Sequence, residues 1–527
     1  MIGKRIFFAS GWLISALCST LKLISGFKTL ALLAGSCFLA FNTPAAGKAT
    51  HVVVVVWDAM RPDFVTEQNC PTLYRLSKSG VSFAHHHSTY PSATEVNGTA
   101  ISTGSYPAHS GLVGNSEYRP AIDLLKGVHT ETPEAVRKGD ELTHGQYLQR
   151  QTLAEIIRGA GRRTAVAGAK PIALLPDRSL RSSPEDCADI FAGATLPVAL
   201  LDVITSKYGP YPKSGAAKND WTAKAMIDPL WAKELPAFSL LWLNEPDATQ
   251  HQTGPGSPES LAAIRNSDGN LARVLEALEA KGAADTTDVF VVSDHGCSTV
   301  ASHQDVAALL TKAGVKATRA FKNKPTPGEV LVVSNSGSCF IYVIGHEHSV
   351  VQAIVKALQT WEFSGAIFTH REMPGTFALS QIHLDSEAPP DVVVSLKWTA
   401  DKNKSGTAGT ITIDGSAFNA GQGAHVSLSP FDMHATLIAA GPDFRKGFVS
   451  ELPSGNVDLA PTILWLLGIK PPKPFDGRVL SEALSSEGPP TTAPELHHIE
   501  AHAGTWRQYL NYTQVNGVDY FDEGNAK

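Results

Sequence analysis

The stretch HVVVVVWDAMRPD, residues 51–63, contains five consecutive valines followed directly by a polar turn. A short apolar run of this kind is typical of a strand that is buried on both faces, as in a parallel sheet covered by helices. Asp58 stands where this strand is expected to end. Because open α/β sheets hold ligands at the carboxyl ends of their strands, this aspartate is well placed to bind a ligand or to take part in catalysis.

The stretch YPSATEVNGTAISTG, residues 90–104, predicts a short helix over residues 93–103. Ser92 and Glu95 have the spacing of a capping box, and Gly104 is a typical helix terminator. Thr94 then lies in the first turn, where unpaired N–H groups and the helix dipole attract anions. A hydroxyl in this place is a candidate nucleophile toward a phosphate-like group.

The composition is that of an ordinary globular protein, with 527 residues, 43% of them hydrophobic and 18% charged, and a formal net charge of −6. This length suits one large α/β domain or two modest ones. No basic excess points to a phosphate backbone as partner, so we expect no binding of nucleic-acid duplexes. The 19 histidines are a generous supply of metal ligands.

Residues 1–46 differ from the rest, because basic residues precede two apolar stretches, 6–18 and 29–41, and small residues follow. This order predicts a secretory signal peptide cleaved near Ala46, and hence a periplasmic or secreted protein with no transmembrane segment after cleavage. A retained N-terminal anchor is the alternative. Lipidation at Cys37 fits less well, because the preceding residues depart from a lipoprotein signal.

Four cysteines follow the predicted signal: Cys70, Cys187, Cys297 and Cys339. Their separations match no zinc-knuckle or thioredoxin spacing, which leaves one or two disulfides or buried thiols as the interpretations.

Residues 238–251 (FSLLWLNEPDATQH) and 286–296 (TTDVFVVSDHG) repeat the opening pattern of an apolar strand that ends in acidic and histidine side chains. The ends of parallel strands converge on one edge of a sheet, so these side chains are expected to meet. Aspartate and neutral imidazole are good ligands for zinc and related divalent ions. The candidate ligands are Asp58, Thr94, Asp247, His251, Asp294, His295 and His425, the last in GQGAHVSLSP.

Other charged and histidine residues receive a structural interpretation. Arg61 and Lys170 could meet substrate charge, but surface salt-bridge partners are the expected interpretation. Three consecutive histidines, residues 85–87, cannot all face one ion from a helix or strand, so a structural or rim role is expected. His434 lies in an apolar stretch and is expected to be a core histidine.

Five motifs, WDAMRPD, SATEVNGTAISTG, NEPDATQH, VVSDHG and GAH, occur in the order used by the alkaline phosphatase superfamily. They resemble its nucleotide pyrophosphatase/phosphodiesterase branch and the related phosphonoacetate hydrolases, over most of residues 52–467. The resemblance implies an α/β fold, an alkaline-phosphatase-like sandwich with a central, mostly parallel sheet between helix layers.

The same resemblance implies two divalent metal ions, with zinc favoured, bridged across a phosphate site. One ion would be held by Asp247, His251 and His425, and the other by Asp58, Asp294, His295 and the Thr94 oxygen. Asn115 matches the asparagine that donates to a phosphate oxygen.

The sequence leaves alternatives open for the identity of the nucleophile and for the substrate. The diesterase branch typically places its nucleophile before an aromatic-Pro-Asn run, and here Thr89 precedes Tyr90 and Pro91. Thr94 is preferred because its spacing to Asn115 fits, and Thr89 remains the alternative. The Thr94-x-x-Asn97 arrangement resembles the phosphonoacetate hydrolase subgroup, which leaves the substrate open.

The sequence thus predicts a signal peptide (1–46), a metallo-hydrolase domain (47–328 and 398–527) and an inserted α/β cap subdomain (329–397). The predicted activity is two-zinc hydrolysis of phosphodiester or nucleotide pyrophosphate bonds through a phospho-threonine intermediate, on a small phosphate-ester or phosphonate substrate. The alternatives are a phosphonoacetate-type C–P hydrolase, a phosphomonoesterase, and a metal-dependent binding protein without activity. The sequence indicates no oligomeric state.

Overall fold

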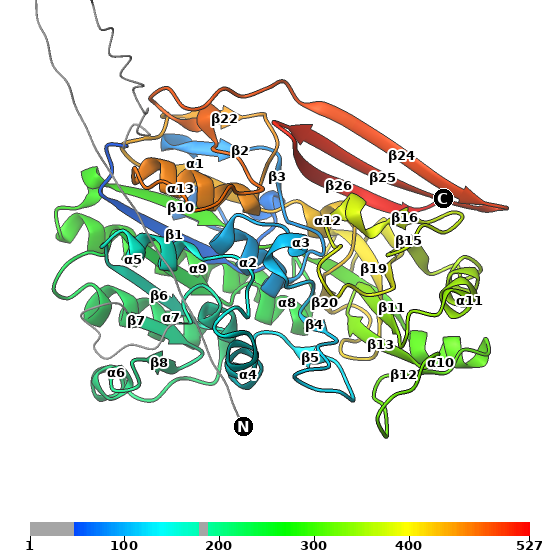
Figure 1. Cartoon of the computed structure of the whole chain (residues 1–527). Helices are drawn as coiled ribbons and strands as arrows, with labels where there is room; N and C mark the ends of the chain where they lie inside the picture. Colours follow the sequence, from blue (N-terminus) through cyan, green and yellow to red (C-terminus); the bar gives the residue numbers. More distant parts are fainter. Residues whose placement is uncertain (1–46, 179–187) are drawn as a thin grey trace, which may run out of the picture. The chain divides into compact units, whose positions relative to one another are not determined.

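The computed structural model describes residues 47–178 and 188–527 (Figure 1); the predicted signal peptide and Cys187 lie outside these ranges. A nine-stranded sheet with the order β22-β2-β21-β10-β1-β9-β6-β7-β8 forms the centre. Its strands are β1 (His51–Trp57), β2 (Val81–Phe83), β6 (Thr164–Gly168), β7 (Ala188–Phe191), β8 (Ala194–Leu196), β9 (Phe238–Leu243), β10 (Thr287–Val292), β21 (Leu437–Ala440) and β22 (Phe448–Ser450). Strands β10, β1, β9, β6 and β7 run parallel to one another, whereas β21 and β8 are antiparallel to their neighbours. The prediction of a central, mostly parallel sheet is confirmed.

Helices cover both faces of this sheet, and the five valines of β1 face them alternately. Val52, Val54 and Val56 pack in one core with α2, α4, α5 and α13, while Val53 and Val55 pack in another with α1, α6, α7 and α9. The bounds are α1 (Pro71–Ser79), α2 (Thr94–Thr103), α4 (Pro133–Thr143), α5 (Leu153–Gly159), α6 (Leu200–Tyr208), α7 (Gly215–Ala225), α9 (Pro258–Ala280) and α13 (Leu459–Leu466). Burial on both faces explains why β1 is an unbroken apolar run rather than an alternating one.

Residues 317–396 build a separate six-stranded sheet with the order β12-β13-β14-β17-β15-β16, flanked by α10 and α11 (Figure 1). The strands are β12 (Ala317–Thr318), β13 (Val330–Asn335), β14 (Ser338–Val343), β15 (Ser364–Thr369), β16 (Phe377–Ala378) and β17 (Val392–Leu396), and the flanking helices are α10 (Val306–Lys312) and α11 (His348–Leu358). A four-stranded sheet is formed by β11 (Ser298–Gln304), which precedes these residues in the chain, and by β18 (Trp398–Lys402), β19 (Ala408–Asp414) and β20 (Gly423–Ala424), which follow them.

The C-terminal residues, which show no clear period in the sequence, form an antiparallel three-stranded sheet of β24 (Glu495–Ala503), β25 (Trp506–Val515) and β26 (Val518–Ala526). This sheet docks on the six-stranded one through Gln508, whose buried amide accepts from Ile367 N at 2.7 Å and donates to Ile367 O at 2.9 Å. Shorter elements complete the chain: β3 (His86–His87), α3 (Pro107–Ser110), β4 (Ser116–Glu117), β5 (Val128–His129), α8 (Asp247–Thr253), α12 (Pro430–Met433) and β23 (Ser454–Gly455).

The helix predicted over residues 93–103 is α2, and Gly104 ends it in the left-handed conformation at φ 61°. The predicted capping box is wrong, because Ala93 is the N-cap residue and no side chain caps this end. The Ser92 hydroxyl instead donates to the carbonyl oxygen of Ser427 at 2.9 Å. The Ser92 side chain thus makes a tertiary contact instead of a helix cap. Thr94 is still the first residue of α2.

Three cysteines of the described chain, Cys70, Cys297 and Cys339, are buried free thiols. Across residues 47–178 and 188–527, the helices lack the combination of length and apolar character needed to cross a bilayer.

A buried carboxyl pair at the start of β10 predicts a pH-dependent stability. Burial, followed by the charge of Asp443, raises the pKa of Asp288 to about 8, against roughly 3.9 for an unfolded aspartate. The folded chain therefore holds a proton that the unfolded chain releases, and stability is lost as pH rises from about 4 through 8. We expect Asp288→Asn to raise Tm relative to wild type at pH 9, with the gain shrinking toward pH 4. Thermal melts across this range measure it, and a pH-independent difference would contradict it.

Candidate metal centre and phosphate site

Three aspartates lie at the carboxyl ends of three adjacent parallel strands. Asp58 follows β1 directly, Asp294 lies two residues after β10, and Asp247 opens α8, four residues after β9. Strand β1 pairs with both β9 and β10, so the three strand ends are neighbours on one edge of the sheet. All three side chains are buried. The convergence expected from the sequence is present.

The first group of candidate ligands consists of Asp247, His251 and His425. One turn of α8 places Nε2 of His251 at 3.0 Å from Oδ1 of Asp247, and Nε2 of His425 lies 3.8 Å from the same oxygen. The ligand atoms of the three residues all lie within 4.8 Å of one another. His425 follows β20, whose pairing with β11 fixes its position.

The second group consists of Asp58, Asp294 and His295. Nε2 of His295 lies 3.2 Å from Asp294 Oδ2 and 3.6 Å from Asp58 Oδ1. The Thr94 hydroxyl lies 3.1 Å from the same nitrogen. The rings of His295 and His425 stack with their centroids 3.7 Å apart, so the two groups adjoin. The structure thus brings together all seven residues that the sequence predicts as metal ligands.

The three histidines share one hydrogen-bonding arrangement. Their Nδ1 atoms lie 2.8–2.9 Å from backbone carbonyl oxygens: His251 on Gly423, His295 on Gly296 and His425 on Ser92. A carbonyl can only accept, so each Nδ1 carries the hydrogen and each Nε2 presents its lone pair to the site. Burial lowers the pKa of His425 to about 4 and that of His295 well below its usual value, which keeps both neutral. This is the usual state of a metal-ligating histidine.

The buried acids show why this site fits cations. Asp58 Oδ1, Asp247 Oδ1 and Asp294 Oδ2 are buried without a hydrogen-bond partner. Burial raises the pKa of Asp58 to about 7 and that of Asp294 well above its usual value. Buried carboxylates without a partner are costly, and neutral imidazoles beside them supply no compensating positive charge. A cation bound at each group would give these atoms the partner that they lack.

Lys170 is a site residue rather than the surface salt-bridge partner that the sequence predicts. Its Nζ lies 2.8 Å from Asp58 Oδ2 and 3.0 Å from Asp247 Oδ2, so it joins the two groups rather than a surface salt bridge. It stands two residues after β6, which pairs with β9. A charged residue at a fourth strand end was visible in the sequence, but the adjacency of that strand was not. Arg61 is also buried, and it pairs with Asp63 outside the two groups.

Lys170→Met is expected to destabilise the metal-free protein by about 3–5 kcal/mol, because it leaves two buried carboxylates without their cation. With zinc present, bound cations replace that charge and the loss in Tm should be much smaller. Melting curves with chelator and with zinc test this. Lys207→Met is the matched control, since its pair with Asp228 is exposed and should matter little in either condition. Equal losses for Lys170→Met with and without zinc would refute this role.

Asn115 lies beside the nucleophile candidate. Its Oδ1 accepts a hydrogen bond from the backbone N–H of Glu95 at 3.2 Å, in the first turn of α2. This orients the amide, and its amino group makes no hydrogen bond within the described residues. The Asn115 amino group can therefore donate to an anion at Thr94.

Two further carboxyls, Glu95 and Glu131, border the site, and no sequence pattern marks them. The Oε2 atoms of both are buried without a partner. Burial, with the neighbouring Glu131, raises the pKa of Glu95 well above its usual value, and burial also raises the pKa of Glu131. Both carboxyls are therefore biased toward the neutral, protonated form.

Thr89, the alternative nucleophile, has a different environment. Its backbone N–H donates to Asn97 Oδ1 at 2.7 Å, and the Asn97 amino group donates to the Thr89 carbonyl at 3.0 Å. Asn97 thus holds the loop that precedes α2. Because the Thr94 hydroxyl, and not that of Thr89, contacts a candidate ligand, the geometry favours Thr94.

Comparisons with known proteins show which proteins this chain is similar to. The chain is 21% identical over 430 residues to bis(5'-adenosyl)-triphosphatase enpp4 of Mus musculus, which covers 80% of this chain and 78% of the relative. Identity to venom phosphodiesterase CdcPDE of Crotalus durissus collilineatus is 22%, over 49% of this chain and 27% of the relative. Human ectonucleotide pyrophosphatase/phosphodiesterase family member 1 is 24% identical, over 48% of this chain and 24% of the relative. The latter two proteins are therefore matched over about a quarter of their length.

The model of the family described as type I phosphodiesterase / nucleotide pyrophosphatase matches residues 52–409. This range contains every candidate ligand except His425, together with Thr94, Asn115 and Lys170. Matching relatives are named as phosphodiesterases and nucleotide pyrophosphatases, which are hydrolytic enzymes. The chain belongs to the type I phosphodiesterase / nucleotide pyrophosphatase family.

Proposed function

We propose that this protein is a two-zinc hydrolase that cleaves phosphodiester or nucleotide pyrophosphate bonds through a phospho-threonine intermediate. The observation that carries the proposal is the meeting of two Asp/His groups beside the Thr94 hydroxyl. Mixed imidazole and carboxylate donors favour zinc over magnesium or calcium, which prefer oxygen alone. Bound cations would lower the pKa of a hydroxyl and stabilise charge on phosphoryl oxygens.

In the first step, Thr94 Oγ1 attacks phosphorus and loses its proton to solvent water as the new O–P bond forms. The bond from phosphorus to the leaving-group oxygen breaks, and that oxygen takes the electron pair. Thr94 is well placed for this because its hydroxyl lies 3.1 Å from Nε2 of His295, a candidate metal ligand, so a cation held there would also reach the hydroxyl. In the second step, water attacks phosphorus, the Thr94 oxygen leaves and regains a proton, and phosphate or a phosphate monoester is released.

Fixed donors stabilise the charge that develops on the phosphoryl oxygens. The first turn of α2 presents backbone N–H groups around Thr94. The Asn115 amino group is aimed by its bond to Glu95 N, and the Lys170 ammonium lies between the two groups. Donors held in place before the reaction need no reorganisation during it, which is the main source of their effect.

The relatives named as phosphodiesterases favour diesters and pyrophosphates over phosphomonoesters. The relative named bis(5'-adenosyl)-triphosphatase also suggests a nucleotide pyrophosphate substrate. The arrangement Thr94-x-x-Asn97, which pointed to phosphonoacetate, has a structural explanation in the bonds from Asn97 to its loop.

A substrate panel tests the proposed activity. Purified protein would be assayed with bis-p-nitrophenyl phosphate, a p-nitrophenyl nucleotide, a p-nitrophenyl monoester and phosphonoacetate, with chelator and with added zinc. We expect the diester and nucleotide to be hydrolysed fastest, activity to disappear with chelator, and zinc to restore it. Faster turnover of the monoester or of phosphonoacetate would assign the site to that substrate instead.

We also propose that residues 1–46 direct export to the periplasm or beyond, and that residues 329–397 act as a cap subdomain of the catalytic domain. Support comes from the basic and apolar pattern of the first 46 residues and from the separate sheet built by residues 317–396. N-terminal sequencing of the exported protein should begin near Gly47. A mature protein that begins at Met1 would contradict cleavage.

A further inference from the structure

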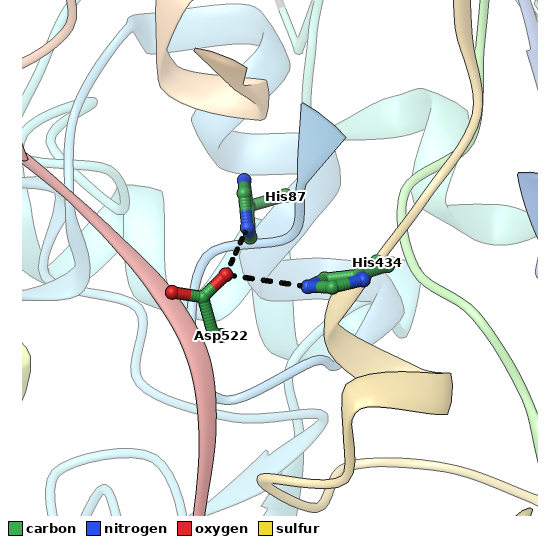
Figure 2. A group of neighbouring side chains, drawn as sticks. All are labelled: His87, His434 and Asp522. Atoms are coloured by element: carbon green, nitrogen blue, oxygen red, sulfur yellow. Dashed lines mark hydrogen bonds and ion pairs between the residues drawn. The ribbon is translucent and has the colours of Figure 1, made fainter. Parts of the chain in front are cut away.

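A second cluster of histidines and an aspartate lies outside the proposed active site. It contains His87 of β3, His434 at the C-terminal end of α12, and Asp522 of β26 (Figure 2). Nε2 of His87 lies 2.9 Å from Asp522 Oδ1, and Nε2 of His434 lies 3.4 Å from the same oxygen. The three ligand atoms all lie within 4.8 Å of one another. His434, expected to be a core histidine, instead lies half-exposed in this cluster.

The protonation state of His87 matches that of the three active-site histidines. Its Nδ1 lies 3.2 Å from the carbonyl oxygen of Ser454, which can only accept, so this nitrogen carries the hydrogen. In the neutral ring, Nε2 then directs a lone pair at the Asp522 carboxylate. His434 Nε2 is buried and makes no aligned hydrogen bond. Two imidazole nitrogens and a carboxylate oxygen that face one point can share either a proton or a metal cation.

The backbone around the cluster is fixed before any ion binds. His87 and His434 are backbone partners in an antiparallel bridge, and Gly455 of β23 pairs with His87 from the other side. Asp522 is the extra residue of a β-bulge, because Tyr512 pairs with Phe521 and Asn511 with Glu523. Bulges redirect a side chain, and here the redirected side chain is the carboxylate that meets both imidazoles.

One side of the cluster opens into a hollow of 630 Å³, which leaves room for water or another ligand to complete a coordination shell. Further imidazoles line the hollow: His85, His497 and His498. His497 Nε2 is buried without a hydrogen-bond partner. A set of two imidazoles and one carboxylate suits zinc and related transition metals, whereas magnesium and calcium prefer oxygen ligands.

We propose that His87, His434 and Asp522 bind a zinc ion distinct from the proposed active-site pair, with an open position facing the hollow. This ion cross-links three segments that are far apart in the sequence, namely β3, the end of α12 and the C-terminal sheet. Zinc bound here ties the C-terminal sheet to the catalytic core, so it raises thermal stability without entering the hydrolytic reaction.

Zinc content of the purified full chain tests the site. Wild type, His434→Ala and Asp522→Asn would be loaded with zinc, desalted and measured by mass spectrometry of the metal. Both variants should hold about one zinc per chain fewer than wild type, keep hydrolysis of bis-p-nitrophenyl phosphate, and lose part of the rise in Tm that zinc produces. Loading with Co²⁺ gives a second readout, because the visible spectrum of His434→Ala should lack the contribution of this ion.

His498→Ala is the matched control, since His498 lines the same hollow but bonds to Asn511 and Glu500 instead. It should bind as much zinc as wild type. Equal zinc in wild type and in both variants would overturn the site, as would an equal loss in His498→Ala. Melts with chelator separate misfolding from loss of metal, and if His434→Ala does not fold, the near-isosteric Asp522→Asn decides the question.

Discussion

Thr94→Ala should lower hydrolysis of bis-p-nitrophenyl phosphate by on the order of 1,000-fold or more, because it removes the only atom proposed to attack phosphorus. The two Asp/His groups and the Asn115 amide stay in place, so zinc content should not fall by a full ion and substrate should still bind. Steady-state kinetics should therefore show the loss in kcat rather than in KM.

Two variants serve as controls for this result. Thr94→Ser keeps a hydroxyl at the same position and should retain much more activity than Thr94→Ala. Thr89→Ala removes the alternative nucleophile, whose backbone rather than side chain is held by Asn97, and should remain active. Full turnover by Thr94→Ala, or its loss in Thr89→Ala, would transfer the role to Thr89 or end the phospho-threonine proposal.

Asp294→Asn should lose about one zinc per chain and at least roughly 100-fold in activity, since it removes the charge of a buried ligand. Its Oδ2 is buried without a hydrogen-bond partner, and its Oδ1 accepts from the backbone N–H of Ala59 at 3.1 Å. An asparagine at this position still accepts the hydrogen bond from the Ala59 N–H, but it lacks the negatively charged oxygen that would bind the metal ion. Metal analysis and kinetics on the same preparation measure both effects.

Asp288→Asn is the matched control for this variant. Asp288 is also buried and stands at the other end of the same strand, β10, where it pairs with Asp443. The same chemical change there should leave zinc content and activity at the wild-type level. If Asp294→Asn kept its full zinc and its activity, the second group would not be a metal site.

The docking of the C-terminal strands could not be predicted from the local sequence pattern. Its strands carry alternating exposed and partly buried residues because they lie on another sheet through one face only. Gln508 docks them through a polar bond to the Ile367 backbone, which no hydrophobic period reveals. Strands β19 and β20 likewise lie in a polar, Gly-rich stretch of the sequence, and the pairing of β20 with β11 is what brings His425 to His295.

The sequence by itself determined the parallel sheet and the residues at its strand ends, because a doubly buried strand needs a continuous apolar run and Asp58, Asp247 and Asp294 lie within four residues after such runs. Only the tertiary structure decided which strands are neighbours, since hydrogen bonds between parallel strands join residues far apart in the chain. That adjacency places Lys170 between two predicted ligands, and it assembles His87, His434 and Asp522 from three segments with no common motif. Local periodicity encodes which face of a helix or strand is buried, whereas these side-chain contacts depend on how the helices and strands pack.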